Sequence, residues 1–376
     1  MEKKIRVGVI FGGRSVEHEV SLVSATSIMK ALDPGRYEVV PIGITKEGRW
    51  LSSAETMHLL KSGGREDREP ERILLPDPTK RSLMQLHERS IDSGGKPLDV
   101  IFPVIHGTYG EDGTIQGLFE LANIPYVGAG VLGSAVGMDK VVAKQLFERA
   151  GLPVTKYTWF FWKSYRSDSK SILKKIEKKL GFPCFVKPAN LGSSVGITKA
   201  HNAEELDSGI EEASSFDRKI LVEVGVRNAR DIECSVLGND DPRASIPGEI
   251  VPSNEFYDYD AKYVDGKSRA IIPAKLPETI VRKVQRYAVA AFRAVDGAGM
   301  ARVDFLVQKK TNRTYLNEIN TIPGFTPISM FPKLWEASGI PYPKLLDMLI
   351  ELALERHRDK SKLRTRYNPK ADWFRR

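Results

Sequence analysis

The stretch YLNEINTIPGFT, residues 315–326, begins like a β-strand but carries an acid and an amide on one face. Side chains two residues apart in a strand point to the same side, so Glu318 and Asn320 present their oxygen atoms together. In the preceding run, MARVDFLVQ, the same period places Arg302 and Asp304 on one face. The polar segment KKTNRT between the two runs predicts a hairpin, which brings Asp304 close to Glu318.

The polar face of this hairpin suits a metal ion that carries phosphates. Two carboxylates and an amide, with an arginine two residues away, are the oxygen ligands and charge that Mg²⁺ and a nucleotide require. A solvated polar sheet face is the alternative interpretation, because alternating strands commonly turn polar residues outward.

Length and composition predict an ordinary globular protein. A chain of 376 residues suggests two or three domains, and 41% hydrophobic with 28% charged residues is typical of a folded protein in water. No apolar run approaches the length of a membrane span, so we expect no membrane insertion. The charged N-terminus leads straight into a strand and lacks a long apolar signal segment, which predicts a cytoplasmic protein.

The formal net charge is +9. Much of the excess lies in KSKLRTRYNPKADWFRR, near the end of the chain, and in KSILKKIEKKLG, which reads as an amphipathic surface helix. Neither segment interleaves aromatic and basic residues in a stacking pattern, so we expect no nucleic-acid partner. The two cysteines, Cys184 and Cys234, lie in apolar runs without metal-ligand spacing and are expected to be buried thiols.

Three β-branched runs dominate the first part of the chain: IRVGVIFGG, YEVVPIGIT and DVIFPVIHG. With a helix predicted over residues 15–32 between the first two, they indicate a parallel α/β domain. Residues 61–96 lack periodicity and read as an extended surface insertion. Asp139 is a plausible N-cap of a helix that ends at Gly151. We therefore predict three units, with boundaries at residues 1–138, 139–226 and 227–376.

The run VKPANLGSSVGI joins Lys187, in an apolar strand, to a glycine-serine loop. The backbone N–H groups and hydroxyls of such a loop can wrap an anion, although a mobile hairpin tip is the alternative. The chain has no GxxxxGK[ST] phosphate loop. The run GAGVLG matches GxGxxG, but it opens a predicted helix after only a short apolar run, so we do not expect NAD binding.

Two further motifs follow strands of the predicted parallel sheet: GGRSVEHEVS and HGTYGEDG. Glu17 and His106 therefore fall at the carboxyl edge of the sheet, where ligands bind, although a purely structural role for His106 stays open. A zinc site is not expected, because Leu22 stands where an HExxH motif needs its second histidine. The polar run EFYDYDAKY suits a lid over a ligand, or else an interaction loop.

Taken in order and spacing, these motifs resemble those of the D-alanine–D-alanine ligases of the ATP-grasp superfamily. The similarity spans residues 4 to about 355 and rests on GGRSVEHEVS, HGTYGEDGTIQGLFE, GVLGSAVGMDK, VKPANLGSSVG, EFYDYDAKY, ARVDF and NEINTIPGFT. The resemblance implies an α/β and α+β protein with the three-domain ATP-grasp architecture, in which ATP lies between the central and C-terminal units.

The resemblance also implies a nucleotide site. Asp304, Glu318 and Asn320 would hold two Mg²⁺ ions, with Mn²⁺ as a possible substitute. The implied ATP-binding residues are Lys140, Lys187, Ser194, Glu223, Asp231 and Lys262, with the lysines 140 and 187 on the phosphates and Glu223 and Asp231 on the ribose and adenine side. Asp231 departs from the family, which usually has glutamate at this position.

The remaining residues implied by the resemblance would bind and activate D-alanine. Glu17 would bind the ammonium of the first D-alanine and join Ser193 and Tyr263 in linking the lid to the N-terminal domain. Arg302 and the backbone N–H of Gly324 would form an oxyanion hole. Ser329 would receive the second carboxylate, and His106 would line the substrate site.

The implied reaction is ATP-dependent ligation of two D-alanine molecules through a D-alanyl phosphate, for peptidoglycan precursor synthesis. The implied partners are D-alanine and ATP, and we expect a homodimer. Two alternatives stay open: another ATP-grasp carboxylate–amine ligase, and a nucleotide-binding sensor without turnover.

Overall fold

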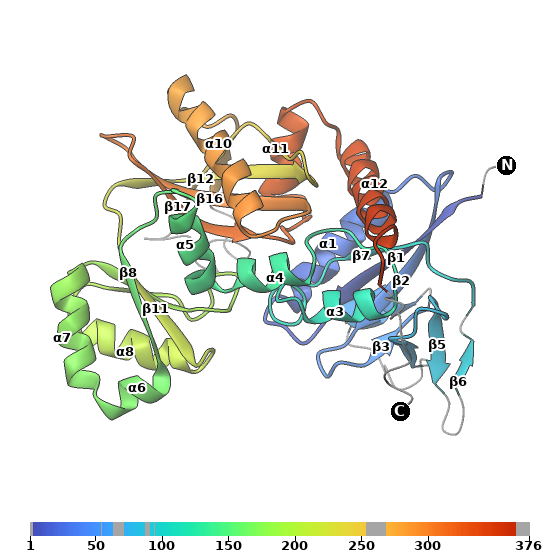
Figure 1. The fold of residues 1–376 in the computed structure, drawn as a ribbon, viewed down its shortest axis with the longest axis horizontal. Helices are drawn as coiled ribbons and strands as arrows, with labels where there is room; N and C mark the ends of the chain where they lie inside the picture. Colours follow the sequence, from blue (N-terminus) through green and yellow to red (C-terminus); the bar gives the residue numbers. More distant parts are fainter. Residues whose placement is uncertain are drawn as a thin grey trace, which may run out of the picture.

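The computed structural model describes residues 3–53, 55–62, 71–86, 91–93, 95–252 and 268–365. Within these ranges, four sheets and the helices around them form a mixed α/β molecule (Figure 1). No helix in these ranges combines the length and apolar character needed to span a membrane.

The first sheet has the strand order β3-β2-β1-β7. Its strands are β1 (Ile5–Gly12), β2 (Tyr37–Ile44), β3 (Trp50–Leu51) and β7 (Val100–Pro103). β2 and β7 both run parallel to β1, which confirms the predicted parallel α/β arrangement. α1 (His18–Ala31) covers one face and α3 (Thr114–Leu121) the other, so both faces are buried and the strands read as continuous apolar runs.

The predicted irregular insertion over residues 61–96 is partly wrong. Its described residues include a small antiparallel sheet, made of β4 (Arg72–Leu74), β5 (Leu83–Leu86) and β6 (Ile91–Ser93), which follows α2 (Thr56–Ser62). These strands have three or four residues, too few to reveal an alternating pattern in the sequence. Leu74 and Leu83 join the same core as Ile10 and Ile42 of the first sheet.

The central sheet has the order β10-β9-β11-β8 and is antiparallel. Its elements are β8 (Tyr157–Phe161), β9 (Cys184–Pro188), β10 (Thr198–Ala200), β11 (Lys219–Val224), α6 (Trp162–Ser167), α7 (Ser169–Leu180) and α8 (Ala203–Ser214). Helices α6 to α8 pack on one face (Figure 1), where Val186 and Val222 contribute to their core. The opposite face carries Leu221, which packs against Val141 of α5 (Lys140–Arg149).

The C-terminal sheet has the order β15-β14-β12-β16-β17, with β13 beside β12. Its strands are β12 (Ala229–Gly238), β13 (Arg243–Ala244), β14 (Gly248–Val251), β15 (Arg269–Ile271), β16 (Gly299–Gln308) and β17 (Thr314–Asn320). α10 (Glu278–Ala294) packs on the face that carries Val303 and Phe305. The predicted hairpin is confirmed: Asp304 lies opposite Glu318, and Arg302 lies opposite Asn320.

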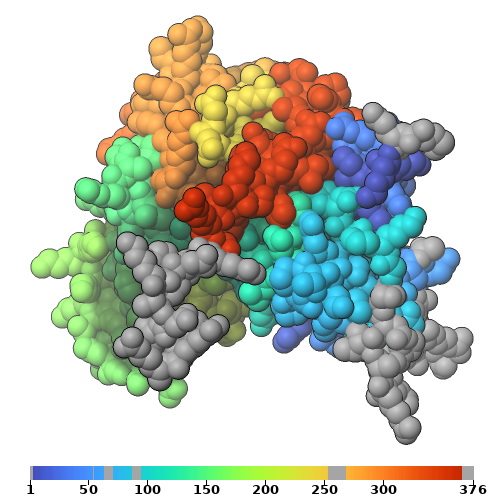
Figure 2. Space-filling model, turned by 45° about the vertical axis from the view of Figure 1, so that its right-hand side comes forward, coloured from blue at the N-terminus to red at the C-terminus, as the bar shows by residue number. Residues whose placement is uncertain are grey.

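Three further helices lie between the C-terminal and N-terminal sheets. They are α4 (Val131–Met138), α11 (Met330–Ala337) and α12 (Tyr342–Ser361). α12 lies beside the first sheet (Figure 1) and shares a core with Val7 and Val9. In Figure 2 the red end of the described chain runs between the yellow and orange C-terminal part and the blue N-terminal part. The segment that follows β17 meets the carboxyl end of β7 and α1, where the Ile322 carbonyl lies 3.1 Å from His106 Nδ1 and the Phe325 N–H donates to Ser24. The carboxyl edge of the first sheet therefore lies close to the polar β16–β17 hairpin of the C-terminal sheet.

Candidate active site

Two neighbouring cavities lie where the three larger sheets approach one another. The first, called here the small pocket, has a volume of about 70 Å³. The second, called the large cavity, has a volume of about 520 Å³ and lies between the central and C-terminal sheets. Glu233, Arg302 and Glu318 line both, so the two cavities are adjacent at these side chains.

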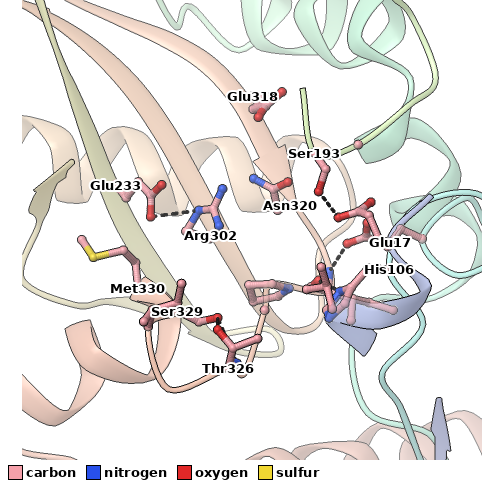
Figure 3. A pocket seen from close by; sticks show the side chains of 17 residues that line it. Glu17, His106, Ser193, Glu233, Arg302, Glu318, Asn320, Thr326, Ser329 and Met330 are labelled. Atoms are coloured by element: carbon pink, nitrogen blue, oxygen red, sulfur yellow. Dashed lines mark hydrogen bonds and ion pairs between the residues drawn. The ribbon is translucent and has the colours of Figure 1, made fainter. Parts of the chain in front are cut away.

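Glu17 stands at the start of α1, directly beyond the carboxyl end of β1, and is only 5% exposed. One carboxylate oxygen, Oε1, accepts a hydrogen bond from the Ser193 hydroxyl (Figure 3). The other, Oε2, is buried and has no hydrogen-bond partner among the described residues. A side chain at Gly192 or at Gly107 would place its Cβ 2.6 or 2.7 Å from Oε2. Both glycines therefore leave room for this carboxylate at the wall of the small pocket.

His106 also lines the small pocket, but the protein engages both of its ring nitrogens. Nδ1 lies 3.1 Å from the Ile322 carbonyl, and Nε2 lies 3.2 Å from the Ser24 hydroxyl. Because the Ile322 carbonyl can only accept, Nδ1 carries the ring proton, and the Ser24 hydroxyl donates to the unprotonated Nε2. Burial lowers the pKa of His106, so the ring is neutral at pH 7. His106 therefore connects the end of β7 to α1 and to the segment after β17.

Arg302 is held between two carboxylates on the polar face of the C-terminal sheet. Its Nε and Nη2 donate to Asp304 at 2.8 and 2.6 Å, and Nε lies 3.2 Å from Glu233 Oε2. Burial alone would lower the pKa of Arg302, but the two carboxylates raise it, so the guanidinium stays charged. In Figure 3 Arg302 and Glu233 lie across the pocket from Glu17. A cation and an anion thus face one small space.

The predicted metal ligands converge as the hairpin register requires. Asn320 donates from its amide to Asp304 at 3.1 Å, and Glu318 Oε2 lies 3.6 Å from Lys140 Nζ. In the described ranges no three His, Cys, Asp or Glu side chains form a metal-binding group. The set has only two carboxylates and an amide, which fits a hard cation whose remaining ligands are phosphates and water. To bind it, Asp304 must exchange part of its contact with Arg302.

The glycine-serine loop between β9 and β10 borders both cavities. Ser193 and Ser194 have φ values of 50° and 60°, the left-handed region that side chains rarely adopt. Lys140, at the start of α5, donates from Nζ to the Leu191 carbonyl at 2.6 Å. This hydrogen bond joins the loop to α5. The strained serines turn the loop toward the cavities, as an anion-binding loop requires.

The wall of the large cavity contains a chain of buried charges. Lys187 forms an ion pair with Glu223 Oε1, and its Nζ lies 3.4 Å from Asn317 Oδ1. Asp231, also predicted, lines the same cavity, together with apolar groups that include Phe185 and Leu306. Apolar walls with a few charged groups at one end are typical of a nucleotide site.

Gly324 and Ser329 lie in the segment between β17 and α11 and line the small pocket. Ser329 Oγ accepts from the Thr326 N–H at 3.0 Å, and the two hydroxyls lie 2.8 Å apart (Figure 3). A Cβ at position 324 would lie 2.7 Å from Ser329 Oγ, so glycine allows the turn to close on this serine. The structure thus gathers all the predicted site residues except Tyr263 and Lys262, which lie outside the described residues.

Comparisons with known proteins agree with this geometry. The family model "D-ala D-ala ligase N-terminus" matches residues 6–129, and the model "D-ala D-ala ligase C-terminus" matches residues 146–351. The chain is 51% identical to the D-alanine–D-alanine ligase of Acetivibrio thermocellus and 54% identical to that of Thermoanaerobacter sp. strain X514. Each match covers 96% of this chain and 99% of the relative. The chain belongs to the D-alanine–D-alanine ligase family.

Solved structures of family members share the fold. The D-alanine–D-alanine ligase of Coxiella burnetii has a TM-score of 0.82 at 36% identity, covering 96% of this chain and 97% of that one. The VanG D-Ala:D-Ser ligase of Enterococcus faecalis also has a TM-score of 0.82, at 34% identity, covering 93% of this chain and 100% of that one. The predicted family and the ATP-grasp fold class are confirmed, whereas the predicted domain boundaries stay predictions.

Sequence reasoning missed three charged residues of the site. Glu111 accepts from the N–H groups of Gly107 at 2.8 Å and Ile322 at 3.2 Å, and burial together with Glu17 raises its pKa to about 8. The other two are Glu233, beside Arg302, and Lys144, beside Glu223. Glu233 could have been found, because it lies two residues from Asp231 on one strand. Glu111 stands in the HGTYGEDG motif, although no spacing singles it out there, and Lys144 gives no signal.

Proposed function

We propose that this protein joins two molecules of D-alanine into D-alanyl-D-alanine, with conversion of ATP to ADP and phosphate. One observation carries the proposal: the buried Glu17, whose Oε2 has no hydrogen-bond partner among the described residues, lines a pocket that Arg302 also lines. A buried carboxylate oxygen without a partner is costly. A substrate ammonium would supply the missing contact. The names of the relatives support D-alanine as that substrate.

The small pocket is complementary to an amino acid. Glu17 would receive the ammonium of the first D-alanine, and the carboxylate of that molecule would point toward Arg302 and the large cavity. Since both cavities share Arg302 and Glu318, this carboxylate would lie close to a nucleotide bound in the large cavity. Such positioning is the main contribution of a protein to phosphoryl transfer.

In the first step, a carboxylate oxygen of D-alanine attacks the γ-phosphorus of ATP, ADP leaves, and D-alanyl phosphate forms. Lys187, Lys140 and the loop that carries Ser193 and Ser194 would bind the phosphates. Asp304, Glu318 and Asn320 would hold Mg²⁺, which when bound offsets phosphate charge. Asp231 and Glu223 would lie on the ribose and adenine side of the nucleotide.

In the second step, the amine of another D-alanine attacks the carbonyl carbon of the acyl phosphate. The carbonyl oxygen becomes an oxyanion, which Arg302 and the Gly324 N–H would stabilise, a contribution of about 3 to 4 kcal/mol per donor. Ser329 would hold the carboxylate of this second molecule. The bond between the acyl carbon and the phosphate oxygen then breaks, phosphate leaves with its electron pair and the carbonyl re-forms. The nitrogen loses a proton, and the peptide bond remains.

The biological setting is also a proposal. A cytoplasmic D-alanyl-D-alanine synthesis would serve peptidoglycan precursors, and we expect the protein to work as a homodimer. Lys262 and Tyr263 would belong to a lid over the two cavities.

The proposed function is tested by measuring ADP release from ATP and Mg²⁺ with D-alanine, D-serine, D-lactate or L-alanine, and by identifying the products. ADP release that depends on D-alanine, with D-alanyl-D-alanine as the product, is expected. The structural match to the D-Ala:D-Ser ligase makes D-serine the second substrate to test. Because that match and the D-alanine–D-alanine ligase match have equal TM-scores, the fold does not separate the two substrates.

Two results would reject the proposal. ADP release that depends on another carboxylate and amine, but not on D-alanine, would indicate a different ATP-grasp ligase. Nucleotide binding without turnover in the presence of any of these substrates would indicate a sensor.

A further inference from the structure

Lys144 is a buried lysine for which the proposed reaction has no role. It lies on α5 behind the wall of the large cavity, and its side chain is 2% exposed. Its Nζ lies 2.8 Å from Glu223 Oε2 and 3.4 Å from Thr155 Oγ1. A lysine is very rarely buried to this extent unless a specific partner compensates its charge.

Glu223 connects Lys144 to the cavity. Its Oε2 accepts from Lys144 and from the Thr155 hydroxyl at 2.7 Å, while its Oε1 is paired with Lys187. Burial by itself disfavours the charged form of Glu223, but the two lysines outweigh it and lower the pKa of this carboxyl well below its usual range. Glu223 and Lys187 line the cavity, whereas Lys144 stands one layer behind them.

In the proposed reaction, one of the two lysines around Glu223 must move, whereas the other can stay in place. On the proposed function, Lys187 must turn toward the phosphates of ATP when the nucleotide binds. Glu223 would then lose one of its two cations while it remains buried at 2% exposure. A buried carboxylate that loses its only cation is strongly destabilised, so a second, fixed cation is needed at this moment.

We propose that Lys144 is a positioning residue of the nucleotide site, which holds the Glu223 carboxylate in place so that Lys187 can exchange Glu223 for the phosphates of ATP. This inference rests on the proposed function, because it assumes that Lys187 binds phosphates. Thr155 fixes the geometry by donating to the same oxygen that Lys144 holds. Lys144 touches neither cavity and acts only through Glu223.

The test is a double-variant cycle read by nucleotide binding. Binding of ADP with Mg²⁺ is measured by calorimetry, without D-alanine, for wild type, K144M, E223Q and K144M/E223Q. We expect K144M to weaken ADP binding and raise KM for ATP about tenfold, as expected for the loss of one charge-assisted hydrogen bond. KM for D-alanine should stay within about twofold. In the E223Q background, K144M should change ADP binding by no more than about twofold.

K219M is the matched control. Lys219 lies on the same strand as Glu223, and its side chain is 17% exposed and paired with Asp139. That pair uses Asp139 Oδ2, whereas the N-cap of α5 uses Oδ1, so the helix start should survive. K219M should bind ADP like the wild type.

Two outcomes would overturn the inference: wild-type ADP binding by K144M, or an equal loss on adding K144M to the wild type and to E223Q. If K144M does not fold, the double variant, which removes both buried charges, is compared with E223Q. Equal ADP binding supports the inference, and weaker binding by the double variant rejects it. ADP binding does not require ligation, so failure of the proposed function would instead appear as wild-type protein without D-alanine-dependent turnover.

Discussion

The Ser193 hydroxyl, in the loop after β9, donates a hydrogen bond to the Glu17 carboxylate at the start of α1. The two residues are 176 positions apart in the chain. This contact closes the small pocket by joining the carboxyl edge of the first sheet to the strained loop of the central sheet (Figure 3). It leaves the second oxygen of Glu17, Oε2, without a hydrogen-bond partner among the described residues.

We predict that Glu17→Gln lowers kcat/KM for D-alanine at least about 30-fold, because a substrate ammonium loses its buried anionic partner. The same variant should unfold at a temperature equal to or above that of the wild type, since it removes a buried carboxylate oxygen that has no partner in the described structure. Steady-state kinetics and thermal unfolding in the absence of substrates check both statements.

Ser193→Ala is the control for the Glu17 variant. It removes one hydrogen bond but keeps the anion, so its loss in kcat/KM should be smaller, about tenfold. Wild-type kinetics in Glu17→Gln would contradict the assignment of this carboxylate to the substrate.

Asp304→Asn and Glu318→Gln should each lower kcat at least about 100-fold, because each removes one of two carboxylates from a site that would hold Mg²⁺. Both should fold, since Asp304 and Glu318 lie on the polar face of the hairpin, away from the core that contains Val303 and Phe305. ADP binding should become less dependent on Mg²⁺ in both variants, as measured by calorimetry over a magnesium series.

Arg313→Met is the matched control in the same hairpin. Arg313 is exposed and stacks on the ring of Tyr315, with 5.1 Å between the guanidinium carbon and the ring centroid. The Arg313→Met variant should have the kcat of the wild type and the same magnesium dependence of ADP binding. An Asp304→Asn protein with wild-type turnover would exclude this carboxylate as a metal ligand.

The metal hairpin could be predicted from the sequence because it is local. The period of two puts Arg302 and Asp304 on one face, and a short polar connection fixes their partners on the next strand. The N-cap at Asp139 was equally accessible, and its carboxylate accepts from the N–H groups of Val141 and Val142. Such features depend on neighbours within a few residues.

The buried charges behind the site could not be predicted in this way. Lys144 meets Glu223 only because α5 packs on the open face of the central sheet, and no spacing in the sequence specifies that packing. Glu111 stands in the HGTYGEDG motif, but no spacing in that motif specifies that its carboxylate accepts from the Ile322 N–H, 211 positions away. The small sheet of β4 to β6 was missed for a different reason: its strands are too short to show a period.

His106 predicts how stability changes with pH. Burial lowers the pKa of this ring below its ordinary value of 6.5, so the unfolded chain takes up a proton that the folded protein does not. The stability that the neutral ring contributes above pH 6.5 is therefore lost as the pH falls. Relative to His106→Gln, the wild type should lose up to about 1.4 kcal/mol of unfolding free energy per pH unit between pH 6.5 and 5.

Urea unfolding at several pH values measures this difference. Equal slopes for His106→Gln and the wild type would show that the ring accepts its second proton in the folded state.

The last prediction concerns α12, which packs in one core with residues of the first sheet and of the C-terminal sheet. Arg356 donates to the Gly128 and Tyr126 carbonyls, and its guanidinium carbon lies 4.5 Å from the centroid of the Tyr126 ring. Arg356→Met should lower the unfolding free energy by about 1 to 2 kcal/mol, through two lost hydrogen bonds and one cation–π contact.

One turn further along α12, Lys360 forms an ion pair with Glu120 whose lysine side chain is 60% exposed. Lys360→Met should therefore cost less than about 1 kcal/mol, because solvent screens an exposed pair. Both variants should keep the wild-type KM for ATP, since neither side chain lines either cavity. Urea unfolding and steady-state kinetics decide the comparison. An equal loss of stability in the two variants would mean that the contacts of Arg356 with the Tyr126–Gly128 segment contribute no more than an exposed ion pair.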